Sequence, residues 1–353
     1  MKKLLLGLFC LVILSALYLS FTDAPISPLA YSPPPAPQMQ GVLAPNEALT
    51  HAELLAKGQI HGPEDLDFDS AGVIYTGTLD GKIVRVYPDQ RVEIFAVTGG
   101  RPLGMRFERH GNLIVVDVAK GLLAIARDGS ITTLATSAEG VPFKLADALA
   151  IASDGRIYFS DATSHVLGEN EIFEILEAKP YGRLLCYDPA TQTATVLLRE
   201  LYFANGVALS RNEDFVLVNE TYRYRTTRYW LKGERAGTSD IFIDNLPGFP
   251  DNISTNEDGT FWLAIFTIRK PIADRIHPYP FAKKLLARLP KFLWPKPSFY
   301  GLALAVDEQG LITRSLHDPT GQHLREITSV REHDGHLYFG TLHDDHLGRI
   351  SIK

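Results

Sequence analysis

Cysteine is almost absent from this chain, which carries only Cys10 and Cys186 in its 353 residues. Cys10 lies within an apolar segment, so we expect no bond between the two and infer no disulfide framework. Neither thiol indicates a cysteine-dependent enzyme. The sequence also lacks a G-x-S-x-G nucleophile elbow and a glycine-rich phosphate-binding loop. The usual signatures of elbow-type serine hydrolases and of P-loop enzymes are therefore missing.

An excess of positive charge is missing as well. Lysine and arginine number 35 against 41 aspartates and glutamates, which leaves a formal net charge of −6. A global basic field of the kind that gathers nucleic acid is therefore excluded, and we expect no nucleic-acid partner. With 45% hydrophobic and 22% charged residues, the chain is neither disordered nor collagen-like, and it can bury a large core.

One long uncharged run stands near the N-terminus, at residues 4–21, directly after Lys2 and Lys3. Its 18 residues are just enough to cross a bilayer as a helix. A cleaved secretory signal would begin in the same way, but residues 22–25 (Thr-Asp-Ala-Pro) offer no clean cleavage site, which favours an uncleaved anchor over residues 1–24. We then expect a single-pass protein with a cytoplasmic N-terminus and the rest of the chain in the periplasm, lumen or exterior, or a secreted protein if cleavage occurs.

The chain after this run divides into a spacer and a repetitive domain. Six prolines between residues 25 and 44 predict a stiff, extended spacer. From residue 45 to 353, short runs rich in Val, Ile, Tyr and Phe alternate with Asp-Gly or His-Gly turns, which is hairpin chemistry. One unit of several strands recurs six times, and arrays of this period are typical of propeller blades. The sequence therefore predicts an all-β, six-bladed β-propeller preceded by an N-terminal transmembrane helix.

Each predicted first strand is preceded by residues at the same phase of the repeat. These pairs are Pro63-Glu64, Leu103-Gly104, Ala146-Asp147, Ala204-Asn205, Pro250-Asp251 and Ile327-Thr328. In a propeller the first strand of every blade lines the central channel, so the six starts converge at one end of it. An Asp or Asn at any single strand entry is usually a turn residue, but here oxygen donors recur at equal phase.

Four of the six positions carry side chains suited to a hard cation: Glu64, Asp147, Asn205 and Asp251. Asn252 adds a further amide. Three carboxylates in a narrow channel would repel one another without a cation, so we expect a metal site. The oxygen donors favour Ca²⁺. Zinc is disfavoured because neither cysteine nor a close histidine pair shares this phase.

Seven motifs carry a family resemblance that extends from about residue 58 to the end of the chain. They are GPEDLDFD at 62–69, GGRPLGMRF at 99–107, GVPFKLADAL at 140–149, FANGVALS at 203–210, RYWLKGERAGT at 228–238, LPGFPDNI at 246–253 and EHDGHLYFGTL at 332–342. Together they resemble the strictosidine synthase-like and adipocyte plasma membrane-associated protein family of calcium-dependent six-bladed propellers. More distantly, they resemble paraoxonases, gluconolactonases of the senescence marker protein type and diisopropyl fluorophosphatase.

The resemblance implies a metal-dependent hydrolase. Glu64, Asn205 and Asp251 match the family's ligand positions, while Asp147 stands where many relatives have asparagine. Related propellers hydrolyse lactones, aryl esters or phosphotriesters with a catalytic calcium. The expected function is therefore a membrane-anchored, calcium-dependent hydrolase of esters or lactones, of the arylesterase or lactonase type, with Asp251 as nucleophile or base. The alternative is a non-catalytic, calcium-stabilised propeller that binds a small molecule or a protein partner.

Strictosidine synthase-like condensation is the third reading and the least favoured. The condensing relative uses a glutamate without a metal, and near its position this chain has Thr328 and Ser329, with Glu326 slightly too early.

Three further residues are candidates for substrate binding. Asn252 would orient the substrate or a bound water. Arg101 would bind an anionic group of the substrate or form a structural salt bridge. His165, in the loop after a blade's second strand, would lie at the pocket mouth or simply be exposed.

A basic insertion interrupts the fifth repeat at about residues 266–298. Its segment 269–296 holds eight basic residues against the single acid Asp274, and its prolines allow one short helix, from about Phe281 to Leu289. It follows a second strand and so emerges on the face of the expected metal site. Two readings stay open: a lid that also contacts an anionic bilayer, or an insertion packed on its own blade.

Overall fold

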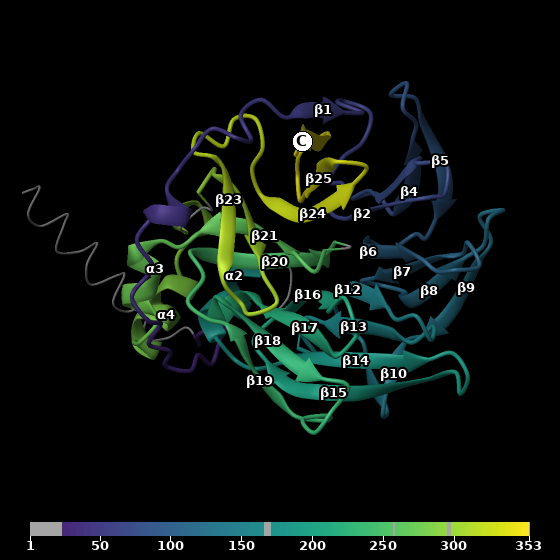
Figure 1. The fold of residues 1–353 in the computed structure, drawn as a ribbon. Helices are drawn as coiled ribbons and strands as arrows, with labels where there is room; N and C mark the ends of the chain where they lie inside the picture. Colours follow the sequence, from purple (N-terminus) through teal and green to yellow (C-terminus); the bar gives the residue numbers. More distant parts are fainter. Residues whose placement is uncertain (1–22, 166–170, 257, 295–297, 353) are drawn as a thin grey trace, which may run out of the picture. The chain divides into compact units, whose positions relative to one another are not determined.

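The computed structural model describes residues 23–165, 171–256, 258–294 and 298–352, in which six four-stranded antiparallel sheets are found (Figure 1). The predicted six-bladed, all-β propeller is confirmed. Within each of the first five blades the strands lie side by side in chain order, as consecutive hairpins require.

The blades are numbered along the chain, and each runs from its inner to its outer strand. Blade one holds β2 (Leu66–Phe68), β3 (Ile74–Gly77), β4 (Lys82–Val86) and β5 (Val92–Val97). Blade two holds β6 (Pro102–Phe107), β7 (Leu113–Asp117), β8 (Gly121–Ile125) and β9 (Ile131–Ala135). Blade three holds β12 (Ala146–Ile151), β13 (Ile157–Asp161), β14 (Gly182–Asp188) and β15 (Thr193–Leu201). Blade four holds β16 (Ala204–Leu209), β17 (Phe215–Glu220), β18 (Arg225–Trp230) and β19 (Ser239–Ile243). Blade five holds β20 (Gly248–Thr255), β21 (Phe261–Ile268), β22 (Gly301–Val306) and β23 (Ile312–Asp318).

Blade six is built from both ends of the described chain. Its inner strands β24 (Ile327–His333), β25 (His336–Thr341) and β26 (Leu347–Ser351) come from the C-terminus, and β1 (Glu53–Leu55) adds the outer strand. Glu53 faces Arg349 across the β1–β26 pair, and the two side chains form an ion pair. The pairing joins the first blade to the last and closes the circle.

Local sequence explains the hairpins, and burial explains how the blades stack. Gly155, in the turn between β12 and β13, has a φ of +88°, a conformation that costs a side chain-bearing residue strain. Between blades three and four, Leu184, Val207 and Val218 are fully buried in one apolar cluster. Burying each such side chain contributes roughly 1.5–3 kcal/mol, and similar clusters lie between the other blades.

Two small connections complete the propeller's described secondary structure. The hairpin of β10 (Ser137–Ala138) and β11 (Val141–Pro142) joins blades two and three. The 3-10 turns η1 (Gly41–Leu43) and η2 (Thr221–Arg223) lie before β1 and after β17.

A second compact unit gathers segments that are distant in the sequence. Its described parts are residues 23–33, 171–179 and 270–294, and we call it the helical unit. It contains α2 (Glu171–Glu177) from the β13–β14 connection, and α3 (Pro271–Ile276), α4 (Pro280–Ala287) and η3 (Lys291–Leu293) from the β21–β22 connection. Helix α4 covers most of the one helix that the sequence predicted in the insertion, whereas α2 and α3 were not predicted. The expected lid role of the insertion stays a prediction.

The predicted transmembrane helix at residues 4–21 lies outside the described residues. Among the residues that the structure does describe, no helix is long and apolar enough to cross a membrane. Residues 25–44, the predicted spacer, contain η1 and no α-helix or strand. Their backbone is nevertheless held in place, since the carbonyl of Pro35 accepts a hydrogen bond from Asn245 and that of Pro34 accepts one from Arg269.

Candidate metal centre

The inner strands form a closed ring, in which each contacts the inner strands of both neighbouring blades and β24 returns to β2. Five of these strands lose their regular pairing at the start. The irregularities lie at Pro102–Met105, Ala146–Leu149, Ala204–Val207, Pro250–Ile253 and Ile327–Ser329. Each of them contains the position that the repeat singled out. Bulges of this kind redirect a side chain out of the regular alternation, so the shared phase of the sequence corresponds to a shared backbone irregularity.

Hydrogen bonds connect the predicted ligands across blades. The amide of Asn252 donates to Glu64 Oε1 at 2.7 Å, although the two residues lie 188 positions apart. The Asn205 side chain donates to the Asp251 carboxylate. The hydroxyl of Thr328 donates to the backbone carbonyl of Glu64 at 2.6 Å. Residues from blades one, four, five and six therefore meet at one end of the channel.

Burial and mutual repulsion disfavour the charged forms of the three carboxylates. Glu64 and Asp147 are each 3% exposed and Asp251 is 8% exposed. Burial, followed by the neighbouring charges of Asp147 and Asp251, raises the pKa of Glu64 well above its usual range. Burial, followed by the charge of Asp65, raises the pKa of Asp147 to about 8. Burial and the charge of Asp147 also raise the pKa of Asp251. Asp147 is thus coupled electrostatically to both other carboxylates.

Three buried oxygens at this site have no hydrogen-bond donor within the described part of the chain. They are Glu64 Oε2, Asn205 Oδ1 and Asn252 Oδ1. A buried acceptor without a partner costs roughly 1–3 kcal/mol, so a cluster of three calls for an explanation. As the side chains stand, no group of three or more His, Cys, Asp or Glu residues in the described ranges is arranged to hold a metal ion. The donor set nevertheless fits a hard cation. One of the unpaired oxygens belongs to a carboxylate and two belong to side-chain amides, and calcium is bound by oxygens of both kinds.

Two side chains, one near the end of β17 and one in η2 directly after it, hold the backbone around Asp251. Asn219, near the end of β17, donates to the carbonyl of Asp251 at 2.5 Å and accepts from Thr226 at 2.7 Å. Thr221 donates to the carbonyl of Pro250 at 2.7 Å. These supporting residues were not identified from the sequence. Their only signal there was a run of polar residues at the end of a strand.

Two acidic residues beside Glu64 form ion pairs, whereas Glu64 forms none with the described residues. Asp65 forms an ion pair with Arg106 at 2.5 Å, and Asp67 forms one with Arg331 at 2.9 Å. These arginines lie on β6 and β24, so the pairs connect three inner strands. Asp65 was not predicted as a site residue from the sequence, yet its buried charge adds to the repulsion at Glu64 and Asp147.

Comparisons with known proteins decide the family. The family profile described as strictosidine synthase matches residues 147–234, and that of the strictosidine synthase-like N-terminal region matches residues 41–86. Adipocyte plasma membrane-associated protein of Rattus norvegicus is 37% identical over 94% of each chain. The chain belongs to the strictosidine synthase-like family. Protein STRICTOSIDINE SYNTHASE-LIKE 6 of Arabidopsis thaliana is 40% identical over 86% of this chain and 82% of its own length.

Solved structures resemble this strictosidine synthase-like chain in fold. A gluconolactonase from Xanthomonas campestris matches with a TM-score of 0.63 and 15% identity, over 94% of this chain and 99% of its own. A calcium-binding protein, regucalcin, from Agrobacterium tumefaciens matches with a TM-score of 0.57 and 12% identity, over 82% of this chain and 89% of its own. At such low identity the likeness shows the propeller fold alone.

The structure separates the two basic candidates for substrate binding in the strictosidine synthase-like propeller. Arg101 Nη1 donates to the carbonyl of Gly62 at 2.9 Å, and its buried Nη2 has no acceptor among the described residues. Its charge acts on Glu64 and Asp147, so Arg101 lies beside the predicted ligands. His165 instead is exposed and packs against the ring of Tyr181 at 4.9 Å, with no contact to the ligands in the described part of the chain.

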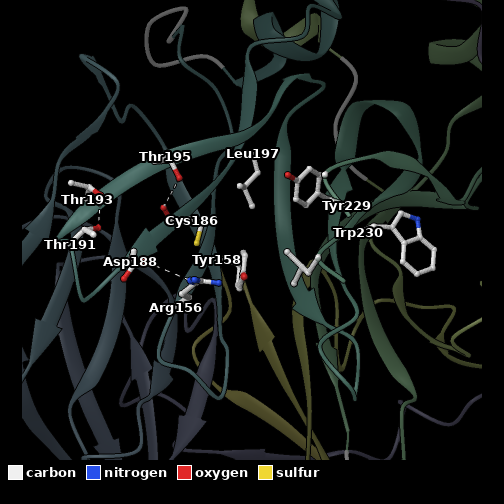
Figure 2. Close-up of a pocket in the computed structure, with 12 residues that line it drawn as sticks. Arg156, Tyr158, Cys186, Asp188, Thr191, Thr193, Thr195, Leu197, Tyr229 and Trp230 are labelled. Atoms are coloured by element: carbon white, nitrogen blue, oxygen red, sulfur yellow. Dashed lines mark hydrogen bonds and ion pairs between the residues drawn. The ribbon is translucent and has the colours of Figure 1, made fainter. Parts of the chain in front are cut away.

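Cavities described in the propeller lie away from these ligands. One of about 360 Å³ opens between blades three and four, and Figure 2 shows Tyr158, Cys186 and Trp230 at its walls. Burial raises the pKa of the Cys186 thiol to about 11, so it is not a ready nucleophile. A second, of about 350 Å³, lies beside residues 118–121. None of the predicted metal ligands lines either cavity.

Gly206 lies where two of the strands that carry predicted ligands, β16 and β20, approach each other closely. A Cβ at this position would lie 2.6 Å from Asn252 Cα and 2.5 Å from the backbone nitrogen of Ile253. We expect Gly206→Ala to push β20 away, to destabilise the propeller by about 1–3 kcal/mol and to weaken its calcium response. Thermal unfolding with calcium and with chelator measures both effects. Gly58→Ala is the control, because it meets only open space and carries just the strain of its φ of +74°. An unchanged calcium response in Gly206→Ala would contradict the prediction.

Proposed function

We propose that this strictosidine synthase-like propeller binds one calcium ion and hydrolyses esters or lactones. Glu64, Asp147, Asn205 and Asp251 would hold the ion. The observation that carries this proposal is the cluster of three buried, unpaired oxygens next to three mutually repelling carboxylates. Such a cluster is costly in a folded chain unless a cation completes it.

The chain's own residues define what each part of the site would do. Bound calcium would supply a Lewis acid that polarises the carbonyl oxygen of the substrate. Asp251 is the most exposed of the three carboxylates, and its main chain is held by Asn219 and Thr221. It would attack the acyl carbon and displace the alcohol, leaving an anhydride that water then hydrolyses, or it would take the proton of a water that attacks the acyl carbon and displaces the alcohol. The unpaired Asn252 Oδ1 would accept a hydrogen bond from that water or from the substrate.

Arg101 and His165 differ in the support for a substrate-binding role. The free Nη2 of Arg101 beside Glu64 would bind an anionic group such as a carboxylate. The exposed position of His165 supports at most a contact at the pocket mouth. The Xanthomonas protein that shares the fold is called a gluconolactonase, which supports the hydrolytic reading for this chain.

Condensation of the strictosidine synthase kind has less support. Thr328 uses its hydroxyl to hold the backbone of Glu64, and Ser329 Oγ is buried. Glu326, the nearest carboxylate, pairs with His343 at 2.8 Å.

A calcium-stabilised binding propeller is the second candidate function. The near-complete burial of the predicted ligands favours it, since a catalytic metal needs a coordination position that the substrate can reach. In this case calcium would hold the inner strands together, and the ligand or partner would bind elsewhere.

Assays on the full-length protein separate the two candidates. A panel of aryl esters and lactones is assayed with calcium and with chelator, and thermal unfolding is followed in parallel. The proposal expects turnover that chelator abolishes and calcium restores, and that falls sharply in Glu64→Gln. A calcium-dependent rise in melting temperature without turnover would instead select the binding propeller. Absence of both effects would exclude a calcium site.

Membrane anchoring completes the proposal. The rat relative is named as a plasma membrane-associated protein, and residues 4–21 are long enough to span a bilayer. We place the N-terminus in the cytoplasm and the propeller on the opposite side of the membrane.

A further inference from the structure

We propose that the helical unit docks onto an anionic phospholipid bilayer through exposed side chains of its α3–η3 segment. We call this set the docking surface; it consists of Ile272, Tyr279, Phe281, Phe292 and Leu293, with the neighbouring basic residues Arg275, Lys284 and Lys291. The inference does not depend on calcium binding or hydrolysis. It does rest on residues 4–21 entering a membrane.

Large apolar side chains are unusually exposed in this short segment. Phe281 is 77% exposed and Phe292 is 78% exposed, and the other three members of the apolar set are each more than half exposed. Single exposed apolar residues need no explanation, but two aromatic rings presented almost entirely to solvent within one small unit do.

The core of the helical unit leaves the docking surface unused. Its buried cluster consists of Ile26, Phe173, Leu176 and Ala287, and Trp294 packs on Phe173 with ring centres 5.3 Å apart. No side chain of the docking surface belongs to this cluster. The exposed rings are therefore not required to hold the unit together.

The charge around the exposed rings matches an anionic surface. Six basic residues lie between positions 270 and 294, against the single acid Asp274; Lys283 is buried, which leaves five that can contribute to the charge of the surface. Arg275 and Lys291 are exposed on the same elements as Ile272 and Phe292. The other acidic residues in the described parts of the unit belong to α2 and to the N-terminal stretch. Interleaved basic and aromatic residues suit the boundary between lipid headgroups and acyl chains.

Chain connectivity favours a bilayer over other occupants. Residues 23–33 are tied into the helical unit, since Leu29 N donates to the carbonyl of Glu177 and the fully buried Lys283 donates to the carbonyl of Leu29 at 2.7 Å. Ile26, in the unit's core, stands five positions after Phe21, the last residue of the apolar run. Five extended residues span at most about 18 Å. A membrane that takes up residues 4–21 must therefore lie next to this unit.

Fluorescence quenching in proteoliposomes tests the docking surface in the full-length chain. Phe281→Trp and Phe292→Trp each add a reporter at an exposed position, and Leu311→Trp adds a matched one on the propeller, where Leu311 is also highly exposed. Each is compared with the wild type, whose own three tryptophans set the background. With phosphatidylserine-containing vesicles and brominated acyl chains, we expect quenching of the added emission at 281 and 292 and little at 311.

Removing charge tests the anionic preference. Lys284→Gln and Lys291→Gln should each lower the ratio of docked to undocked protein by about fivefold, read from the same quenching signal. Vesicles of phosphatidylcholine alone should show correspondingly weaker quenching. Unchanged melting temperatures would show that the variants are folded.

Three results would overturn the proposal. Quenching at 281 and 292 no stronger than at 311 would mean that the surface does not reach the bilayer. Equal quenching in neutral and anionic vesicles would show that the docking surface has no preference for anionic lipid. The third result is a blue-shifted emission that brominated lipid does not quench. If this shift is seen in nanodiscs that hold two chains and not in those that hold one, a second copy of the chain covers the surface.

Discussion

Replacing Asp251 by asparagine is expected to lower kcat/KM for calcium-dependent ester hydrolysis by about 10²–10⁴-fold. The substitution keeps the size of the side chain and an oxygen donor, but it removes the charge that would attack the acyl carbon or take a proton from water. Asn205 already donates to the Asp251 carboxylate, and Asn219 holds the backbone carbonyl of Asp251. The new amide should therefore occupy the same place. Turnover of an aryl ester at saturating calcium, per folded molecule, measures the effect.

Asp67→Asn is the matched control for that experiment. Asp67 is 8% exposed, as is Asp251, and it lies on an inner strand of the same channel. Its carboxylate is paired with Arg331, so its loss should lower stability and leave turnover per folded molecule close to that of the wild type. Full activity in Asp251→Asn would refute the catalytic role of Asp251. Equal losses in the two variants would show that activity reports only on the packing of the channel.

Replacing Asp147 by asparagine is expected to change the free energy of unfolding in opposite directions in the calcium-free and the calcium-bound protein. In chelator near neutral pH the variant should be more stable than the wild type by about 3 kcal/mol, because folding raises the pKa of Asp147 and asparagine carries no such cost. With calcium the order should reverse or the difference should vanish, since the ion loses a charged ligand. Chemical denaturation with calcium and with chelator provides both free energies of unfolding.

Asp117→Asn distinguishes this electrostatic effect from a general response to losing a buried carboxylate. Asp117 is fully buried at the end of β7, but it accepts hydrogen bonds from Thr98 and from the backbone of Ala119 and Lys120. Its replacement should destabilise the protein by about 1–2 kcal/mol with or without calcium. If Asp147→Asn also destabilises the protein with or without calcium, the buried carboxylates of the channel do not repel one another appreciably. The main reason to expect a cation is then removed.

The candidate site was largely predictable because a repeat converts sequence phase into spatial position. Each blade places the start of its inner strand at the same end of the channel, so Glu64, Asn205 and Asp251 could be grouped although they lie far apart in the chain. Residue chemistry then selected the oxygen donors. Asp65 was not predicted, because it stands one position after the phase shared by the ligands. The sequence does not show whether a carboxylate there faces the channel or pairs with Arg106.

The helical unit was harder to foresee. Its helices are short, and they come from two connections about 100 residues apart, together with a proline-rich stretch that carries no periodic signal. Helices of one to two turns are marginal by themselves and form only where tertiary packing stabilises them. The sequence showed an excess of basic and aromatic residues in one insertion, but it did not show which of those rings would be buried.

Sequence patterns were sufficient to predict the propeller, the number of its blades and the family, and to propose a set of oxygen donors at one end of the channel. The propeller and its blade number follow from local alternation and from the period of the repeat, and the family follows from the motifs between residues 62 and 342. Three features could be seen only in the folded chain: which donors have no partner among the described residues, how Asn219 and Thr221 hold the backbone at Asp251, and which side chains of the insertion are exposed. Each of these depends on contacts between residues far apart in the chain, because burial and hydrogen-bond satisfaction are settled only when the blades close against one another.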